Sequence, residues 1–416
     1  MAKENKQGEK PAKTAVVLSG AGARGAFQAG ALSVLIPALE REGARPTIWL
    51  GTSAGSINAA LWGSLAHRGA EEAAEEVLGL WRRMSDDDVY RPLLPFSFPR
   101  TMAQYGVGAL LGRGPGTTSL LDTAPLRRTA ADELNVEQLG ANVEEGRVDA
   151  VGVVATRLPA EVDSTVAGTA GGRSVLFLHE HRPGAYKGDP DRALDVARLP
   201  VERDHVVASS AIPVAFPPVR ILAPAEASGW YVDGGVRLNT PLHPAVGLGA
   251  TRIVVVSATA TTYAAPLPNP AGSSPDIADA AAQVLTAALA DRTTEDLLSL
   301  RRTNRLVAQV SSANGPGKLV RSSGAPYRRV EVMTVSPPPG EMGRVAAEVF
   351  SRRTGGVGWL TEMDNWLLGR AIRGAGDGVG RRELLSYLFF DEEYFAAGID
   401  LGRRTATDAL SQGWLT

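Results

Sequence analysis

The chain has no cysteine at all, and this excludes disulfides, thiolate metal sites and cysteine nucleophiles. It contains no run of about 18 apolar residues, so no membrane-spanning helix is expected. It carries no excess of charge of one sign, because 43 Lys and Arg residues face 45 Asp and Glu residues. No general attraction to nucleic acid follows from that balance. The polar N-terminus lacks the apolar core of a signal peptide, and a cytoplasmic protein is expected.

Hydrophobic residues make up 44% of the 416 residues and charged residues 21%, which is typical of a globular chain. Changes in composition along the chain predict its organisation. We expect a disordered polar tail, an α/β domain, a loop within that domain that could act as a lid, a linker-like segment and a mostly helical C-terminal portion. Their ranges are 1–13, 14–260, 90–118, 261–275 and 276–416.

Short apolar runs alternate with segments of helical spacing. Such alternation predicts a mostly parallel central sheet flanked by helices. The expected strands are Ala15–Leu18, Ile48–Leu50, Asp149–Thr156, Ser174–His179, Trp230–Val232 and Arg252–Ser257. The expected helices are Ala26–Glu42, Ala54–Ala66, Ile277–Val310 and Leu384–Leu410.

The strongest chemical signal is a G-x-S-x-G motif over Gly51–Gly55, directly after an expected strand and before an expected helix. A sharp turn of this kind exposes the Ser53 hydroxyl, as in a nucleophile elbow. Side chains at positions 51 and 55 would collide with neighbouring backbone, and glycine avoids that collision. The following helix N-terminus favours negative charge close to Ser53.

A second glycine motif, G-x-G-x-x-G over Gly20–Gly25, follows the first expected strand. Such a loop binds a dinucleotide, forms a tight structural turn, or presents backbone N–H groups to an oxyanion. The acidic residue that binds the ribose in a dinucleotide site is missing about 20 residues further on, where the serine motif stands instead. The sequence favours an oxyanion hole. Arg24 would attract an anionic substrate group or pair with an acidic side chain.

Asp233, Gly234 and Gly235 follow the expected strand Trp230–Val232. An Asp-Gly pair by itself only indicates a turn. In a chain with a nucleophilic serine, a carboxylate held at a strand end is also a candidate general base.

The three motifs in this order resemble those of the patatin-like phospholipase family. The resemblance extends to Ala208–Pro218 and Asp233–Pro241, covers residues 14–260 and is weaker over Tyr387–Asp408. It implies a three-layer α/β catalytic domain and a lipid or phospholipid acyl ester substrate, with no cofactor and no metal. It also implies a Ser53–Asp233 dyad that acts through an acyl-enzyme, and an oxyanion hole at Gly20, Ala21 and Gly22. The supporting motif positions are Arg24, Gly25, Gly51, Gly55, Gly234 and Gly235.

Two alternatives stay open at this point. The order Ser53, Asp233, His243 is that of a Ser-His-Asp α/β-hydrolase esterase, although only ten residues separate the last two. The other alternative is a nucleotide-binding regulatory protein that binds its ligand with the loop Gly20–Gly25. The expected partner is a lipid or fatty-acyl ester, with room for transient contact with a membrane surface, and no nucleic acid.

Overall fold

The computed structural model describes residues 13–92, 121–159, 172–184, 186–189, 192–213, 215–261, 293–312, 327–354 and 379–415. The predicted tail, lid-like loop and linker-like segment lie almost entirely outside these residues. None of the described helices is long and apolar enough to cross a membrane.

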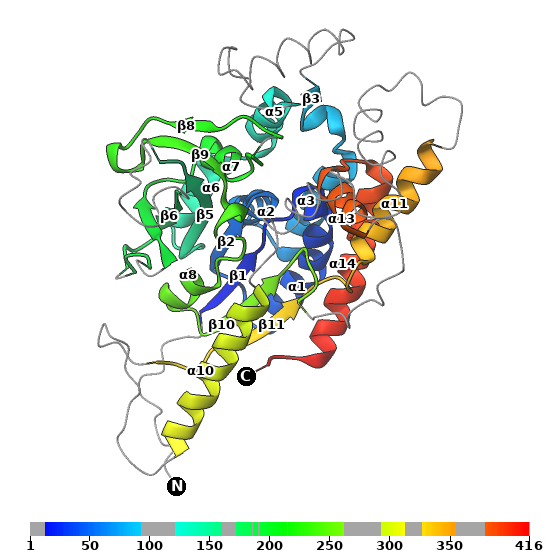
Figure 1. The fold of residues 1–416 in the computed structure, drawn as a ribbon. Helices are drawn as coiled ribbons and strands as arrows, with labels where there is room; N and C mark the ends of the chain where they lie inside the picture. The colour runs from blue at the N-terminus through cyan, green and yellow to red at the C-terminus, as the bar shows by residue number, and fades with distance from the viewer. Residues whose placement is uncertain are drawn as a thin grey trace, which may run out of the picture.

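A nine-stranded sheet forms the centre of the molecule in the described residues (Figure 1). Its strands run in the order β11-β10-β1-β2-β5-β6-β7, while β9 pairs with β5 and β8 with β9. The five strands from β11 to β5 are mutually parallel. The bounds are β1 Thr14–Leu18, β2 Ile48–Thr52, β5 Ala150–Arg157, β6 Arg173–Glu180, β7 Leu194–Arg198, β8 Val219–Ile221, β9 Gly229–Asp233, β10 Arg252–Val256 and β11 Glu331–Val335. Strands β3 Arg91–Pro92 and β4 Leu121–Asp122 pair separately.

Helices cover both faces of the sheet. They are α1 Gly25–Arg41, α2 Ala54–Ser64, α3 Ala70–Arg83, α5 Ala124–Glu133, α6 Val136–Glu144, α7 Arg203–Ser209, α8 Leu242–Gly247, α10 Thr293–Ser312, α11 Glu341–Thr354, α13 Val379–Leu388 and α14 Glu392–Gln412. Short 3₁₀ turns stand at Gly22–Arg24, Asp86–Asp88, Ala225–Ala227 and Gly234–Val236.

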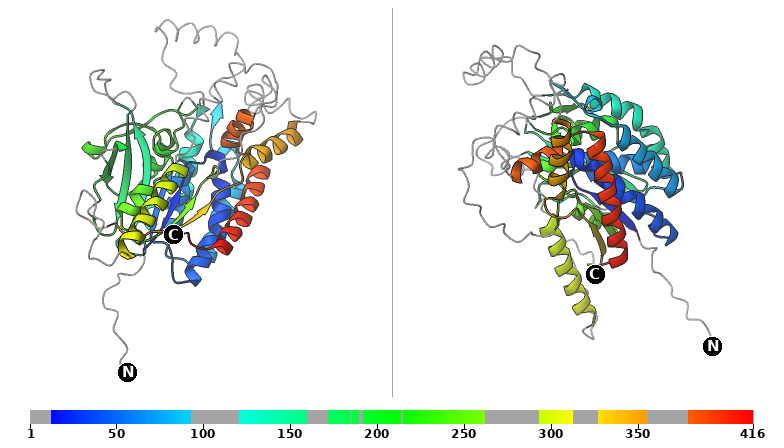
Figure 2. Two further views of the ribbon diagram at one scale, coloured as in Figure 1. Left: turned by 60° about the horizontal axis from the view of Figure 1, so that its bottom comes forward. Right: turned by 90° about the vertical axis from the view of Figure 1, so that its right-hand side faces the viewer.

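The alternation of side chains along β1 separates two hydrophobic cores. Val16 and Leu18 join the larger core, with α1, α2, α3 and α14, whereas Ala15 and Val17 join the smaller core, with α8 and α10. Figure 2 shows the sheet between these helical layers. The strands β1 and β10 are buried on both faces, which explains their continuous apolar sequences. The three-layer α/β architecture predicted from the sequence is confirmed.

The central sheet contains three strands that the sequence did not predict, and one predicted helix is divided in two. The strands β7, β8 and β11 were not expected, and β11 lies within the portion predicted to be mostly helical. It pairs with β10, so this portion shares the central sheet. The single helix predicted over Leu384–Leu410 is two helices, because the Asp391 side chain accepts hydrogen bonds from two backbone N–H groups and starts α14. The helix predicted over Ile277–Val310 is described only as α10.

Candidate active site

Ser53 stands between β2 and α2 in a backbone conformation that residues other than glycine rarely adopt, with φ 55° and ψ −133°. Strain of this kind is typical of functional positions. A β-carbon on Gly51 would lie 2.2 Å from the Gly55 carbonyl oxygen, and one on Gly55 would lie 2.4 Å from the Ser19 carbonyl oxygen. The turn therefore forms only with glycine on both sides of the serine.

Ser209 holds this turn in place from the neighbouring helix α7. The Ser53 backbone N–H donates to Ser209 Oγ at 2.8 Å, and Ser209 Oγ donates to the Val154 carbonyl on β5. The sequence motifs do not single out Ser209. The sequence indicates a role for Ser209 only through its position within Ala208–Pro218, a segment that carries part of the family resemblance.

Asp233 ends β9 and is 1% exposed. The Gly235 backbone N–H donates to Asp233 Oδ1 at 2.7 Å, while Oδ2 has no hydrogen-bond partner of good geometry in the described residues. Burial raises the pKa of Asp233 to about 6, and the neighbouring Ser53 hydroxyl and Gly235 N–H act in the opposite direction. The structure thus brings together Ser53 and Asp233, which are far apart in the sequence.

The glycine loop lies against Ser53. A β-carbon on Gly20 would lie 3.4 Å from Ser53 Cβ, so the loop passes directly beside the serine. The Gly20 N–H donates to the Asn239 carbonyl at 3.0 Å. Ala21 has a φ of −139°, which suits alanine, whereas Gly22 has a φ of +52°. In the described residues the amides of Ala21 and Gly22, unlike that of Gly20, make no hydrogen bond with the backbone.

Arg24 is 1% exposed and faces the interior. Its guanidinium pairs with the Glu383 carboxylate, donates to Ser386 Oγ and the Ala258 carbonyl, and lies over the Tyr387 ring. The sequence left two roles open for Arg24, and the structure contains the pairing with an acidic side chain. Arg24 links the glycine loop to α13.

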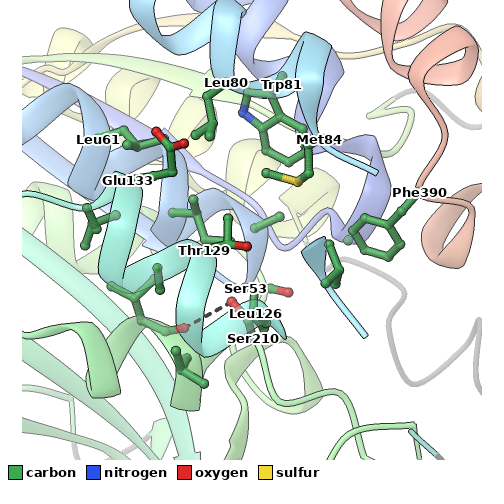
Figure 3. A pocket seen from close by; sticks show the side chains of 18 of the residues that line it. Ser53, Leu61, Leu80, Trp81, Met84, Leu126, Thr129, Glu133, Ser210 and Phe390 are labelled. Atoms are coloured by element: carbon green, nitrogen blue, oxygen red, sulfur yellow. Dashed lines mark hydrogen bonds between the residues drawn. The ribbon is translucent and has the colours of Figure 1, made fainter. Parts of the chain in front are cut away.

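An apolar pocket of about 700 Å³, including its open mouth, begins at Ser53. Figure 3 shows Ser53, Leu126 and Ser210 close together, with Trp81, Met84 and Phe390 on other sides. Its remaining lining residues are Gly22, Ala54, Ile57, Leu61, Leu80, Val89, Thr129, Ala130, Glu133, Leu134, Val206, Val207, Ile212 and Phe216. The sequence did not reveal this pocket, because it depends on how α2, α3, α5 and α7 converge.

His243 belongs to a different cluster. Its Nε2 atom lies 3.4 Å from Asp296 Oδ1 on α10, and Arg192 lies 3.1 Å from the same oxygen. Burial by itself raises the pKa of Asp296, but His243 and Arg192 together bring that pKa below its usual value. In the described residues, no group of three or more histidines and carboxylates is placed to hold a metal ion.

Comparison with known proteins gives the family. Residues 16–246 match the family model Patatin-like phospholipase, which is more than half of the chain. Solved structures similar to it include VipD from Legionella pneumophila, with 14% identity and a TM-score of 0.35 over 97% of this chain and 68% of that one. Another is human GIVD cytosolic phospholipase A2, with 12% identity and a TM-score of 0.34 over 59% of this chain and 45% of that one. No curated protein matches the sequence. From the family match, the chain belongs to the patatin-like phospholipase family and is a lipid acyl hydrolase.

Proposed function

We propose that this protein cleaves lipid and phospholipid acyl esters with a Ser53–Asp233 dyad, through an acyl-enzyme intermediate. The observation that carries the proposal is that a strained serine and a buried carboxylate stand together where an apolar pocket begins. A hydrocarbon chain fits that pocket because nearly all its lining is apolar, which places the ester carbonyl beside Ser53.

In the first step, Asp233 takes the proton of the Ser53 hydroxyl as Oγ attacks the ester carbonyl carbon. The amides of Ala21 and Gly22 donate to the oxyanion of the tetrahedral intermediate, since the Gly20 amide is already bonded to Asn239. The intermediate collapses, and the leaving alcohol takes the proton from Asp233. The acyl group then stays bonded to Ser53 Oγ.

In the second step, Asp233 takes a proton from a water molecule that attacks the acyl carbonyl carbon. Collapse of the second intermediate returns the proton to Ser53 and releases the fatty acid. Burial helps Asp233 in both steps, because a carboxylate with a pKa of about 6 is a stronger base than one in water. Above that pH it is still mostly ionised and ready to accept a proton.

The two alternatives from the sequence are less well supported. His243 lies beside Asp296, so a Ser-His-Asp triad would have to break an existing pair. The loop Gly20–Gly25 packs beside Ser53, and this position suits an oxyanion better than a nucleotide.

Transient contact with a membrane surface is part of the proposal. Leu222, directly after β8, and Trp230 on β9 are exposed, and the Arg220 guanidinium lies over the Trp230 ring. Leu158 adds a further exposed apolar side chain. It lies beside Trp230, because its backbone N–H donates to the Trp230 carbonyl. Tryptophan beside arginine is a combination suited to the interface between lipid headgroups and acyl chains.

The experiment is covalent labelling of the full chain with a fluorophosphonate, followed by peptide mass spectrometry. We expect the label on Ser53, with loss of hydrolysis of phospholipid and p-nitrophenyl acyl esters in proportion. Ser56→Ala is the matched control, because Ser56 is a buried serine on α2, the helix that follows Ser53, and its hydroxyl donates to the Ser53 carbonyl. Equal labelling of a folded Ser53→Ala variant would contradict the proposal.

A further inference from the structure

The pocket has two ends of different character. Ser53, Leu126 and Ser210 stand at one end, and Leu61, Leu80 and Glu133 are grouped at the other (Figure 3). Between the ends, the lining side chains are almost all apolar. The pocket is therefore a channel with a defined start and a defined far end.

Two helices that follow the channel give its length. Along α2, Ile57 and Leu61 line the pocket at helical spacing after Ser53, and the eight residues from Ser53 to Leu61 rise about 12 Å. Along α5, the seven residues from Leu126 to Glu133 rise about 10 Å. The two helices agree on the distance from the nucleophile to the far end.

A wall of three side chains separates that far end from a second cavity. Leu61, Leu80 and Glu133 also line the second cavity, whose other residues are mostly polar or charged. These include Ser64, His67, Arg68, Glu76, Asn135 and Gln138. Glu133 is in addition held by Arg83 at 2.7 Å. A hydrocarbon chain that passed the wall would leave apolar surroundings for polar ones, which is unfavourable.

We propose that the wall of Leu61, Leu80 and Glu133 limits the substrate acyl chain to about eight to ten carbons; the inference rests on the proposed function. An extended chain with carbon–carbon bonds of about 1.5 Å and angles near 111° advances about 1.25 Å per carbon. A channel as long as these helix rises, about 10–12 Å, therefore holds about eight to ten carbons. The site selects medium-length acyl esters.

The expected length profile follows from burial of methylene groups. Each methylene that enters the apolar channel raises kcat/KM by up to about fourfold. Beyond about ten carbons the gain ends, because further methylenes have no apolar wall to contact. The profile should rise to its maximum and then fall, because a longer chain has to pass the wall into polar surroundings.

The test uses the full chain and p-nitrophenyl esters with acyl chains of roughly four to sixteen carbons, at concentrations where they stay monomeric. Leu80→Ala opens the wall, and Ile57→Phe narrows the channel one helical turn after Ser53. Leu78→Ala is the matched control, because Leu78 is a fully buried leucine on the same helix that does not line the pocket.

We expect Leu80→Ala to raise the ratio of kcat/KM for long to medium chains by at least about tenfold, and Leu78→Ala to leave it unchanged. Ile57→Phe should move the maximum of kcat/KM to acyl chains of about five carbons. If Leu80→Ala does not fold, this variant by itself tests whether the channel limits chain length. Equal kcat/KM for ten and sixteen carbons in the unaltered chain, or no shift with Ile57→Phe, would overturn the inference alone. Absence of any hydrolysis that depends on Ser53 would overturn the proposed function itself.

Discussion

Two buried aspartates lie in different surroundings, one at the end of strand β9 and one on helix α10, each beside a group with which it can exchange a proton. Asp233 shares its position with the Ser53 hydroxyl and has no cationic neighbour among the groups that shift its pKa. Asp296 contacts His243 and Arg192. Burial raises the pKa of both carboxylates, and the neighbouring groups decide whether the final pKa lies above or below its usual value.

The difference shows what separates a candidate base from a structural ion pair. Arg192 and His243 hold the pKa of Asp296 low, so that side chain is suited to joining α8, α10 and the loop of Arg192. Asp233 keeps a raised proton affinity and stands beside an apolar pocket that begins at Ser53. A buried carboxylate without a cation and beside a cavity is the better place to look for catalysis.

The largest effect is expected when each aspartate is replaced by asparagine. Asp233→Asn should lower kcat by at least about 10³-fold, because the amide cannot accept the serine proton. Asp296→Asn should keep kcat within about tenfold but lower the melting temperature, since it removes the ion pair with Arg192 and weakens the contact with His243. Hydrolysis of a soluble ester gives kcat, and thermal unfolding gives the melting temperature of each variant. Equal losses of kcat in the two folded variants would contradict the distinction.

The second test concerns the loop amides proposed as oxyanion donors. Gly22→Ala should lower kcat by about 10²–10³, because its φ of +52° and the Tyr387 carbonyl oxygen, 2.4 Å from the added β-carbon, force the loop to move. Gly43→Ala is the control, with a φ of +69° but no atom within 4 Å of the added carbon. It should cost stability through strain and leave kcat unchanged. A loss of kcat that is the same in both variants would count against an oxyanion role for the loop.

The third test is pH. We expect kcat/KM to fall about tenfold per pH unit below about 6, because protonated Asp233 cannot act as a base. The raised pKa has the opposite effect on folding: the proton stabilises the folded state at acid pH, and this stabilisation is lost as the pH rises from about 4 through about 6. Asp233→Asn should remove that pH dependence from the melting temperature. An acid limb of kcat/KM centred near 4 would contradict the role of burial.

The smallest expected effect is that of His243→Ala. We expect kcat/KM to stay within about tenfold, which corresponds to a barrier change of about 1.4 kcal/mol. The melting temperature should fall because Asp296 loses one of its two partners. If the folded variant were as inactive as Ser53→Ala, a Ser-His-Asp triad would replace the dyad.

Local patterns in the sequence were sufficient for the centre of the fold. The uninterrupted apolar runs of β1 and β10 and the glycine turn after β2 predicted a buried parallel sheet with a serine at a strand end. These features depend on a few consecutive residues. The roles assigned to Ser53, Asp233 and the loop Gly20–Gly25 stay predictions that the variants above address.

The rest depends on contacts between distant segments. Strands β7 and β8 are short and carry polar or charged residues, so neither has a clear periodicity. The pocket is lined from four helices whose apolar faces resemble those of any core helix. Phe390 reaches it from a segment more than 300 residues after Ser53. No local rule assigns such side chains to a common cavity.

The contact between α1 and α14 has a consequence for the order of events during synthesis. A β-carbon on Gly30 would lie 2.2 Å from the Ile399 carbonyl oxygen, and one on Gly402 would lie 2.1 Å from the Phe27 carbonyl oxygen, so the two helices touch backbone to backbone. Helix α1 continues directly from the glycine loop beside Ser53. A nascent chain therefore carries Ser53 and Asp233 long before it carries the helix that supports α1, and we expect lipid cleavage to begin only after α14 has left the ribosome.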